Sequence, residues 1–294
     1  MKKHIITVAA LFMAALNIQA QGLVINKTDG TKLYLPAEQV ESITTYDFRD
    51  WDLPEGDSPA FTANGVTFRM KLVEAGTFVM GSEDSDAFNN ENPMTSVTFS
   101  KDCYFSETEV TQELWEAVMG SNPSYFKDPQ RPVESVTWDA CHEFLEKLSH
   151  ITGHPFRMPT EAEWEFAARG GNKSRGFHYS GSSFLDDVAW NKANTFDKGA
   201  NSSAYGTHAV ATKKPNELGI YDMSGNVSEW CEDWYGVYPP GDKTDPTGPD
   251  HGFYHVYRGG GWDSAARLCR VTWRGNATAD KAYNNLGIRL ALSY

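Results

Sequence analysis

The clearest hydrophobic pattern in the chain is the strict alternation of apolar and polar side chains over residues 66–72, VTFRMKL. A period of two predicts a β-strand that buries one face. Ala75 and Gly76 then form a turn, and residues 77–80 are predicted to return as the partner strand. This pair of strands is expected to open the main domain.

Three later segments, residues 111–120, 137–153 and 160–170, follow the period of amphipathic helices. Each begins at a threonine, a residue that favours the N-cap, and each ends at a glycine, which favours the C-cap. In the third segment, Thr160 and Glu163 have the spacing of a capping box. The sequence therefore predicts three capped helices in series.

The third helix contains several carboxylates that resemble a catalytic cluster. Glu161 and Glu163 lie in its first turn, where negative charge complements the helix dipole, and Glu165 follows. Arg157 and Arg169 flank the segment and are suitable partners for ion pairs. We therefore predict a structural role for these carboxylates.

The first 20 residues have the pattern of a secretory signal peptide. Lys2 and Lys3 precede an apolar run at residues 5–16, and the segment ends at Ala20. The apolar run is too short for a membrane span, and no later segment approaches the length that a span requires. The sequence predicts an exported protein of the periplasm, cell surface or medium, without a transmembrane segment.

Residues 21–46 predict a small β module, because extended runs flank Asp29 and Gly30, a dipeptide typical of hairpin turns. A further extended run at 43–46 is a candidate third strand. The segment that follows is acidic and contains prolines, which is typical of a linker. The predicted organisation is a signal peptide, a β module, an acidic linker and a main domain, at residues 1–20, 21–46, 47–62 and 63–294 respectively.

The net charge of the chain indicates which classes of binding partner are compatible with it. The chain carries a formal charge of −13, and loss of Lys2 and Lys3 with the signal peptide makes it −15. Such a charge argues against nucleic acid and anionic membrane surfaces. It is compatible with cation binding.

Residues 218–235, LGIYDMSGNVSEWCEDWY, combine turn formers, carboxylates and aromatic side chains with few aliphatic ones. Residues 222–226 include the turn formers, whose side-chain oxygens fold back onto the chain, and Glu229 follows. Calcium takes about six to eight oxygens from carboxylates and backbone carbonyls. One interpretation of the stretch is a calcium site, and the other is an acidic turn ahead of an aromatic core strand.

The histidines do not predict a zinc or non-haem iron centre. His150 and His154 have a helical interval, but Gly153 ends the helix between them. His251 and His255 have the same interval in a segment that favours an extended conformation. There is also no nucleophile elbow, P-loop or dinucleotide fingerprint.

Several motifs resemble those of the formylglycine-generating-enzyme family, also called sulfatase-modifying factors. They occur in the family's order, as TFVMGS, FRMPTEAEWEFAARGG, LGIYDMSGNVSEW, YRGGGW and NNLGIRLAL, between residues 77 and 292. The resemblance implies an α+β fold, a variant of the C-type-lectin fold with much irregular loop. The small β module would precede this domain.

The resemblance also implies calcium sites. One set would comprise the side chains of Asp222 and Glu229 with the carbonyls of Gly225 and Val227. A second would begin at Asn194 and the carbonyl of Thr195. The later ligands of this second set would fall at Ser202 and Ala204, where the family's aspartate is absent.

Family members that make formylglycine bind Cu(I) through two cysteines five residues apart. Alignment of the YRGGGW motif places Cys269 on the second of them and Ser264 on the first. Cu(I) favours thiolates, and a serine hydroxyl is a poor ligand for it. We therefore do not predict copper as a cofactor, and Ser264 is a degenerate position in the catalytic pair.

The four cysteines, Cys103, Cys141, Cys231 and Cys269, leave three alternatives open: disulfides, buried thiols or a catalytic thiol. Cys231 and Cys269 each follow a motif that borders the same site in the family fold. The resemblance therefore makes a bridge between these two the preferred alternative.

Trp262, Arg267 and Arg274 surround the position of the family's substrate groove. They are candidates for binding a protein or carbohydrate ligand, and ion pairs within this acidic chain explain the arginines equally well. The sequence thus favours an exported, non-catalytic binding or assembly protein of the envelope. The alternative is a formylglycine-generating oxidoreductase that oxidises a sulfatase cysteine, with Cys269 as its surviving thiol.

Overall fold

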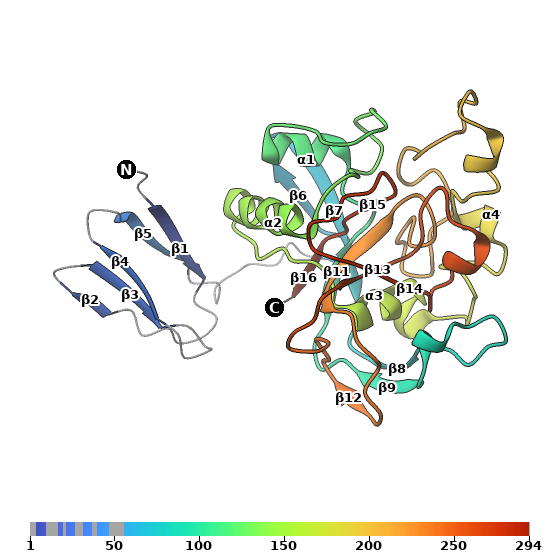
Figure 1. Ribbon diagram of the computed structural model, residues 1–294, viewed down its shortest axis with the longest axis horizontal. Coiled ribbons are helices and arrows are strands. Elements are labelled where there is room, and N and C mark those ends of the chain that lie inside the picture. The colour runs from blue at the N-terminus through green and yellow to red at the C-terminus, as the bar shows by residue number, and fades with distance from the viewer. Residues whose placement is uncertain are drawn as a thin grey trace. The chain divides into compact units, whose positions relative to one another are not determined.

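A computed structural model describes the backbone of five strands before residue 47, and residues 56–293 in full. The chain forms two compact units, Met1–Leu53 and Pro54–Tyr294 (Figure 1). The strands of the first unit are β1 His4–Ala9, β2 Asn17–Gln19, β3 Gly22–Asn26, β4 Lys32–Pro36 and β5 Val40–Tyr46. Those of the second are β6 Ala60–Ala63, β7 Val66–Val73, β8 Thr77–Met80, β9 Thr95–Thr98, β10 Cys103–Ser106, β11 Ser228–Trp234, β12 Lys243–Thr244, β13 His255–Arg258, β14 Arg274–Ala277, β15 Leu286–Gly287 and β16 Ala291–Ser293. The helices are α1 Gln112–Met119, α2 Trp138–Thr152, α3 Glu161–Ala168 and α4 Leu185–Val188, with short 3-10 turns at η3 Asn89–Glu91, η4 Gly171–Lys173, η5 Phe196–Lys198 and η6 Ala266–Leu268.

In the first unit, β3 pairs antiparallel with β2 and with β4. The predicted hairpin corresponds to β3 and β4, with Leu23 opposite Leu35. The candidate third strand lies in β5, which pairs parallel with β1 instead of joining the hairpin. Both β1 and β2 lie within the predicted signal peptide, whose removal stays a prediction.

The alternating segment forms β7, which lies inside a sheet of order β16-β10-β7-β6. Its hairpin partner is β6, so the predicted pairing with residues 77–80 is wrong. Asn64 and Gly65 form the connecting turn with φ of 46° and 90°, the left-handed geometry that a two-residue hairpin requires. Residues 77–80 form β8, which pairs with β9 in a separate sheet of order β12-β9-β8. β6 also places residues 60–62 of the predicted linker inside the domain.

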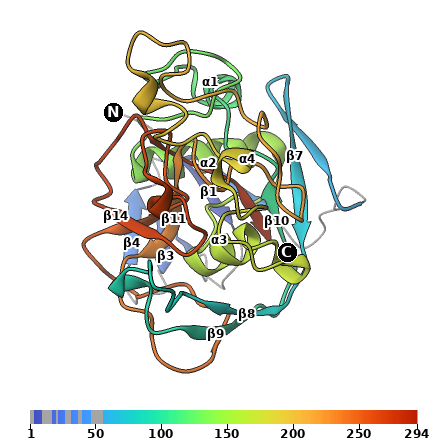
Figure 2. The ribbon, with the colours of Figure 1, turned by 90° about the vertical axis from the view of Figure 1, so that its right-hand side faces the viewer.

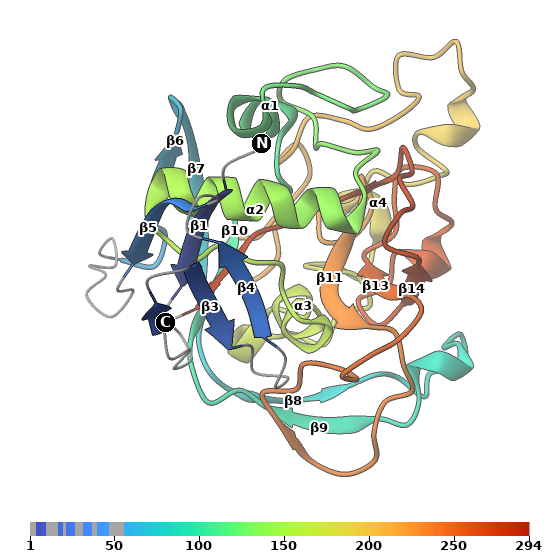
Figure 3. The ribbon, with the colours of Figure 1, turned by 60° about the vertical axis from the view of Figure 1, so that its left-hand side comes forward.

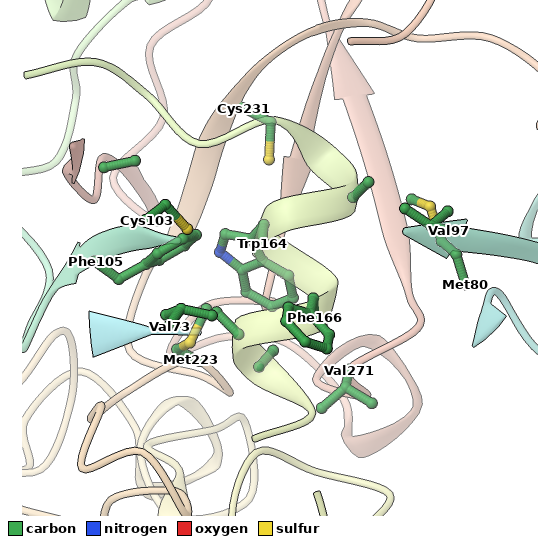
Figure 4. Close-up of a cluster of buried hydrophobic side chains, with 14 of the residues drawn as sticks. Val73, Met80, Val97, Cys103, Phe105, Trp164, Phe166, Met223, Cys231 and Val271 are labelled. Atoms are coloured by element: carbon green, nitrogen blue, oxygen red, sulfur yellow. The ribbon is translucent and has the colours of Figure 1, made fainter. Parts of the chain in front are cut away.

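The third sheet of the domain has the order β14-β13-β11-β15. Figure 2 shows α3 surrounded by the sheets and the long loops that join them. In the core, Trp164 and Phe166 of α3 pack with buried residues from several strands, including Phe105 and Val97 (Figure 4). The arrangement confirms the predicted α+β class. No helix among the described residues is long and apolar enough to cross a membrane.

The helix caps agree with the sequence. Thr111 and Thr137 accept the amides of Leu114 and Ala140, and Gly120 and Gly153 end these helices in the left-handed conformation. Thr160 and Glu163 form the predicted capping box at the start of α3.

The carboxylates of α3 have the predicted structural role. Glu163 binds Arg157 with oxygen to nitrogen distances of 2.7 Å. Glu165 binds Arg169 at 2.7 Å and also pairs with Arg258, whose guanidinium is fully buried. Each carboxylate is therefore neutralised by an arginine within hydrogen-bond distance, and the paired groups fix α3 to the sheet behind it.

Candidate functional site

The segment from Asp222 to Glu229 leads into β11, and its backbone conformation depends on its motif residues. Asp222 and Asn226 have φ of 59° and 60°, and Gly225 has φ of 83°. A Cβ at Gly225 would lie 2.2 Å from the carbonyl oxygen of Trp190, so only glycine is accommodated there. The side chain of Asn226 accepts the amide of His208 at 2.9 Å.

Glu109 fixes the same loop from the other side. One of its carboxylate oxygens accepts the side-chain amide of Asn226 at 2.7 Å, and the other accepts the backbone amide of Val227 at 2.9 Å. Burial, with Asp222 and Glu229 nearby, raises the pKa of Glu109 well above its ordinary value. The sequence analysis missed Glu109, which lies more than 100 positions from its partners and carries no local signal.

Glu229 is engaged in a buried ion pair with Arg289. Its carboxylate accepts a hydrogen bond of 2.6 Å from the Trp164 indole and three of 2.7 to 2.9 Å from the guanidinium of Arg289. Both ion-pair partners are fully buried. A cation at this carboxylate would face the positive charge of Arg289, and the role of Glu229 as a calcium ligand stays a prediction.

Asp222 differs from Glu229, because one of its two carboxylate oxygens accepts no hydrogen bond from the described residues. Its Oδ2 atom accepts the amide of Ala211 at 2.7 Å, while the buried Oδ1 atom has no hydrogen-bond partner. Burial raises the pKa of Asp222 to about 6. A buried carboxylate oxygen without a hydrogen-bond donor can instead be stabilised by a bound cation. Within the described part of the chain, no group of three histidine, cysteine or acidic side chains is placed to hold a metal, so the remaining ligands would have to include carbonyls.

The second predicted calcium set is held by internal hydrogen bonds. Asn194 accepts the amide of Asn191 through its side-chain oxygen at 2.8 Å. The carbonyl of Thr195 accepts the amide of Lys198 at 3.0 Å. Each of these two oxygens thus accepts one hydrogen bond within the loop, and their role as calcium ligands stays a prediction.

Ser264 and Cys269 lie at the two ends of a short turn around η6. The Ser264 hydroxyl accepts the amide of Gly261 at 2.9 Å, and its carbonyl is 3.9 Å from the Cys269 sulfur. Cys269 has no exposed surface, and burial, with Asp263 nearby, raises the pKa of its thiol to about 12. The thiol is therefore protonated and shielded at neutral pH, which is the opposite of what a Cu(I) ligand requires.

The predicted disulfide between Cys231 and Cys269 is not formed. All four cysteines are buried free thiols. Cys231 lies in the core cluster around Trp164, as Figure 4 shows, whereas Cys269 packs beside Gly260 at the end of the η6 turn. The two sulfurs occupy separate packing environments, although both motifs border the same part of the fold.

The three residues predicted to line a ligand groove are not brought together on one surface. Trp262 is 2% exposed and donates its indole N–H to the carbonyl of Asn284. Arg274 is 3% exposed and forms two hydrogen bonds of 2.6 and 2.7 Å with Glu161. Arg267 is exposed and lies over the ring of Phe88 at 3.7 Å. The ion-pair alternative is therefore the right one for Arg274.

Trp262 instead supports a cluster of aromatic rings that the sequence analysis did not single out. Phe126, Phe196 and Tyr205 have ring centroids 5.1, 5.7 and 4.8 Å from that of Trp262, and Tyr125 contacts Phe126 at 4.9 Å. Tyr125 is 71% exposed and Phe196 is 41% exposed. We call these five residues the aromatic cluster. Its members come from three separate loops, so no sequence spacing reveals it.

Comparisons with known proteins agree with this architecture. Residues 58–294 match the family model described as Sulfatase-modifying factor enzyme 1-like domain. The chain is 33% identical to Chaperone protein LppX of Paenibacillus barcinonensis, over 78% of this chain and 90% of that protein. It is 32% identical to Formylglycine-generating enzyme of Streptomyces coelicolor, over 60% and 57% respectively. The solved structure of Treponema denticola variable protein 1 is 32% identical with a TM-score of 0.72, and covers 82% of this chain and 100% of its own.

Proposed function

Because this chain belongs to the family of sulfatase-modifying factor enzyme 1-like domains, we propose that it is an exported member that binds a ligand without catalysing the family's oxidation. The observation that carries this proposal is the state of the catalytic pair. Ser264 occupies one position, and the remaining thiol, Cys269, is fully buried and protonated. Export is supported by the signal-peptide pattern of residues 1–20.

The aromatic cluster is the surface that we propose for ligand binding. Large rings held by a buried tryptophan lose little conformational entropy when they contact a ligand. Exposed polar residues of the adjoining loop, including Asp197, Asn201 and Ser203, supply hydrogen-bonding groups beside the rings. Flat rings with polar neighbours suit a carbohydrate, whose C–H faces pack on aromatic side chains while its hydroxyls bind polar groups.

The proposal predicts that the second unit binds an oligosaccharide on a glycan array, and that loss of the exposed rings weakens this binding. Combined Tyr125→Ala and Phe196→Ala replacement is expected to reduce affinity by about 5-fold to 150-fold, since ring contacts contribute about 0.5–1.5 kcal/mol each. The matched control is Phe184→Ala, which removes a ring that is 76% exposed and lies outside the cluster. Equal losses in both variants, or none in either, would contradict the assignment.

We also propose that Asp222 holds a calcium ion, with the carbonyls of Gly225 and Val227 that the family resemblance implies. A calcium concentration 100-fold above its dissociation constant would stabilise the fold by about 2.7 kcal/mol. Chelation with EDTA should therefore lower the melting temperature by about 5–10 °C, and Asp222→Asn should abolish this response. An unchanged melting temperature in protein that elemental analysis shows to be free of metal would refute calcium binding.

A further inference from the structure

A second candidate site lies at the opposite end of the domain from the aromatic cluster. It is a cavity of about 550 Å³ between β8 and β9, the start of α3 and the segment that carries β12. Figures 1 and 3 place β8, β9 and β12 at the lower end of the domain, and the loop that contains Phe196 at the upper end. The cavity has the size of a small-molecule site.

The walls of this cavity are mainly apolar. Its apolar lining consists of Met80, Val97, Ala162, Trp234, Val237, Tyr238, Pro239, Pro246 and Pro249. Val237, at the rim, is 81% exposed, whereas Val97 is 1% exposed. The cavity thus runs from solvent into the core, and it offers a molecule both aromatic and aliphatic contacts.

Charged side chains of α3, β11 and β14 form the inner end of the cavity, and most of their hydrogen-bonding capacity is already used. Glu161 accepts two hydrogen bonds from Arg274 and one of 3.2 Å from Tyr238. Arg274 directs its remaining N–H groups to the carbonyls of Asn90 and Gly236. The charges of Glu161 and Arg274 thus neutralise each other, and most of their hydrogen bonds are made within the protein.

Asp233 is the exception. It is 5% exposed, and its Oδ2 atom accepts the backbone amide of Glu161 at 2.8 Å. Among the described residues, no donor reaches Oδ1. Gly248 lies directly against this carboxyl group, because a Cβ there would be 2.8 Å from Oδ1, and Gly248 itself lines the cavity. The cavity therefore contains one carboxyl oxygen without a hydrogen-bond partner among the described residues, on a side chain whose residue is only 5% exposed.

We propose that this cavity binds a small organic ammonium ion, whose nitrogen donates to Asp233 Oδ1 and whose apolar body contacts Trp234, Tyr238 and Val97. A mainly apolar cavity in which Arg274 neutralises Glu161, and in which Asp233 has no ion-pair partner among the residues that the structure describes, is complementary in charge and shape to such a molecule. The site shares no residue with the aromatic cluster, so it stands independently of the function proposed above.

Binding at this site should depend on pH. Burial, followed by repulsion from the Glu161 carboxylate, raises the pKa of Asp233 to about 8. The other charged or titratable groups that face the site are Glu163, Glu232, Tyr238, Arg274, Lys243 and Asp245. At neutral pH the carboxyl group is protonated, so a bound ammonium ion must displace that proton. As the pH is raised towards 8, the affinity for the ammonium ion should therefore increase by up to 10-fold per pH unit. Above pH 8 the affinity should become constant.

The first test is calorimetric titration with phenethylamine, with 2-phenylethanol as a neutral molecule of the same shape. We expect the amine to bind more tightly, with an affinity at pH 8 at least 5-fold above that at pH 6.5 and with proton release. Asp233→Asn retains an oxygen for the Glu161 amide, and it should remove both the preference for the amine and the pH dependence. Equal binding of the alcohol, undiminished binding by Asp233→Asn, or no binding of the amine at millimolar concentration would overturn the proposal.

A second test uses two variants at an exposed position, where a substitution should not disturb the packing of the core. Val237 is exposed at the rim, so Val237→Arg and Val237→Glu should both fold normally. The arginine is expected to weaken amine binding and the glutamate to strengthen it, each by about 2-fold to 5-fold. Tyr125→Ala serves as the control and should change nothing. Shifts of the same sign in the two Val237 variants would contradict an ammonium ligand.

Discussion

Replacement of Arg289 by methionine is expected to lower the free energy of unfolding by about 3–5 kcal/mol. Arg289 is fully buried and forms three hydrogen bonds to Glu229, and it also donates to the carbonyls of Ser106 and Tyr221. Methionine would leave a buried carboxylate with only the Trp164 indole as a partner. Urea denaturation followed by tryptophan fluorescence measures the change.

An exposed pair provides the control for this experiment. Lys147 and Glu143 form an ion pair of 2.7 Å one turn apart on α2, with side chains 45% and 59% exposed. Lys147→Ala should change stability by no more than about 0.5 kcal/mol. If Arg289→Met cost as little as Lys147→Ala, the buried pair would have no special role in the fold.

The native protein is expected to show almost no reaction with thiol reagents, and to produce no formylglycine. Burial raises the pKa of all four cysteine thiols, that of Cys269 to about 12. At pH 8 this lowers the thiolate fraction of Cys269 by a factor on the order of 10³ relative to an ordinary cysteine, before access is considered. Timed labelling of native and urea-unfolded protein measures the reactivity.

Incubation with Cu(I), oxygen and a sulfatase-derived cysteine peptide tests the oxidation directly. The Streptomyces coelicolor enzyme is the positive control, and an aldehyde-specific probe reports the product. Aldehyde formed by this protein at a comparable rate, and lost in Cys269→Ala, would establish the alternative oxidoreductase function. If the Ser264→Cys variant formed aldehyde and the unaltered protein did not, the loss of activity would be assigned to position 264.

Local patterns predicted those parts of the fold that are determined by neighbouring residues. The caps at Thr111, Thr137 and Thr160 depend on contacts within one helical turn, and all three were predicted. The partner of β7 was not. Its alternating sequence specifies one buried face but no partner, and most of β6, which the Asn64-Gly65 turn joins to β7, lies in the segment interpreted as linker.

The site was less predictable, because its contacts join distant parts of the chain. Glu229 and Arg289 are 60 positions apart. The resemblance to a calcium-binding motif therefore could not reveal that Arg289 forms an ion pair with the carboxylate of Glu229. Burial of Trp262 and Cys269 likewise arises from packing between loops. The sequence motifs identified the family correctly. The burial and the hydrogen-bond partners of each site residue, however, depend on tertiary contacts that the sequence does not reveal.

The two final strands have a consequence for the order of events in the cell. β15 completes one sheet by pairing with β11, and β16 completes another by pairing with β10, while Arg289 lies between them and neutralises Glu229. A ribosome makes this segment after the rest of the domain. Neither sheet is complete until residues 286–293 have been made, so the domain should fold only after this segment has left the ribosome.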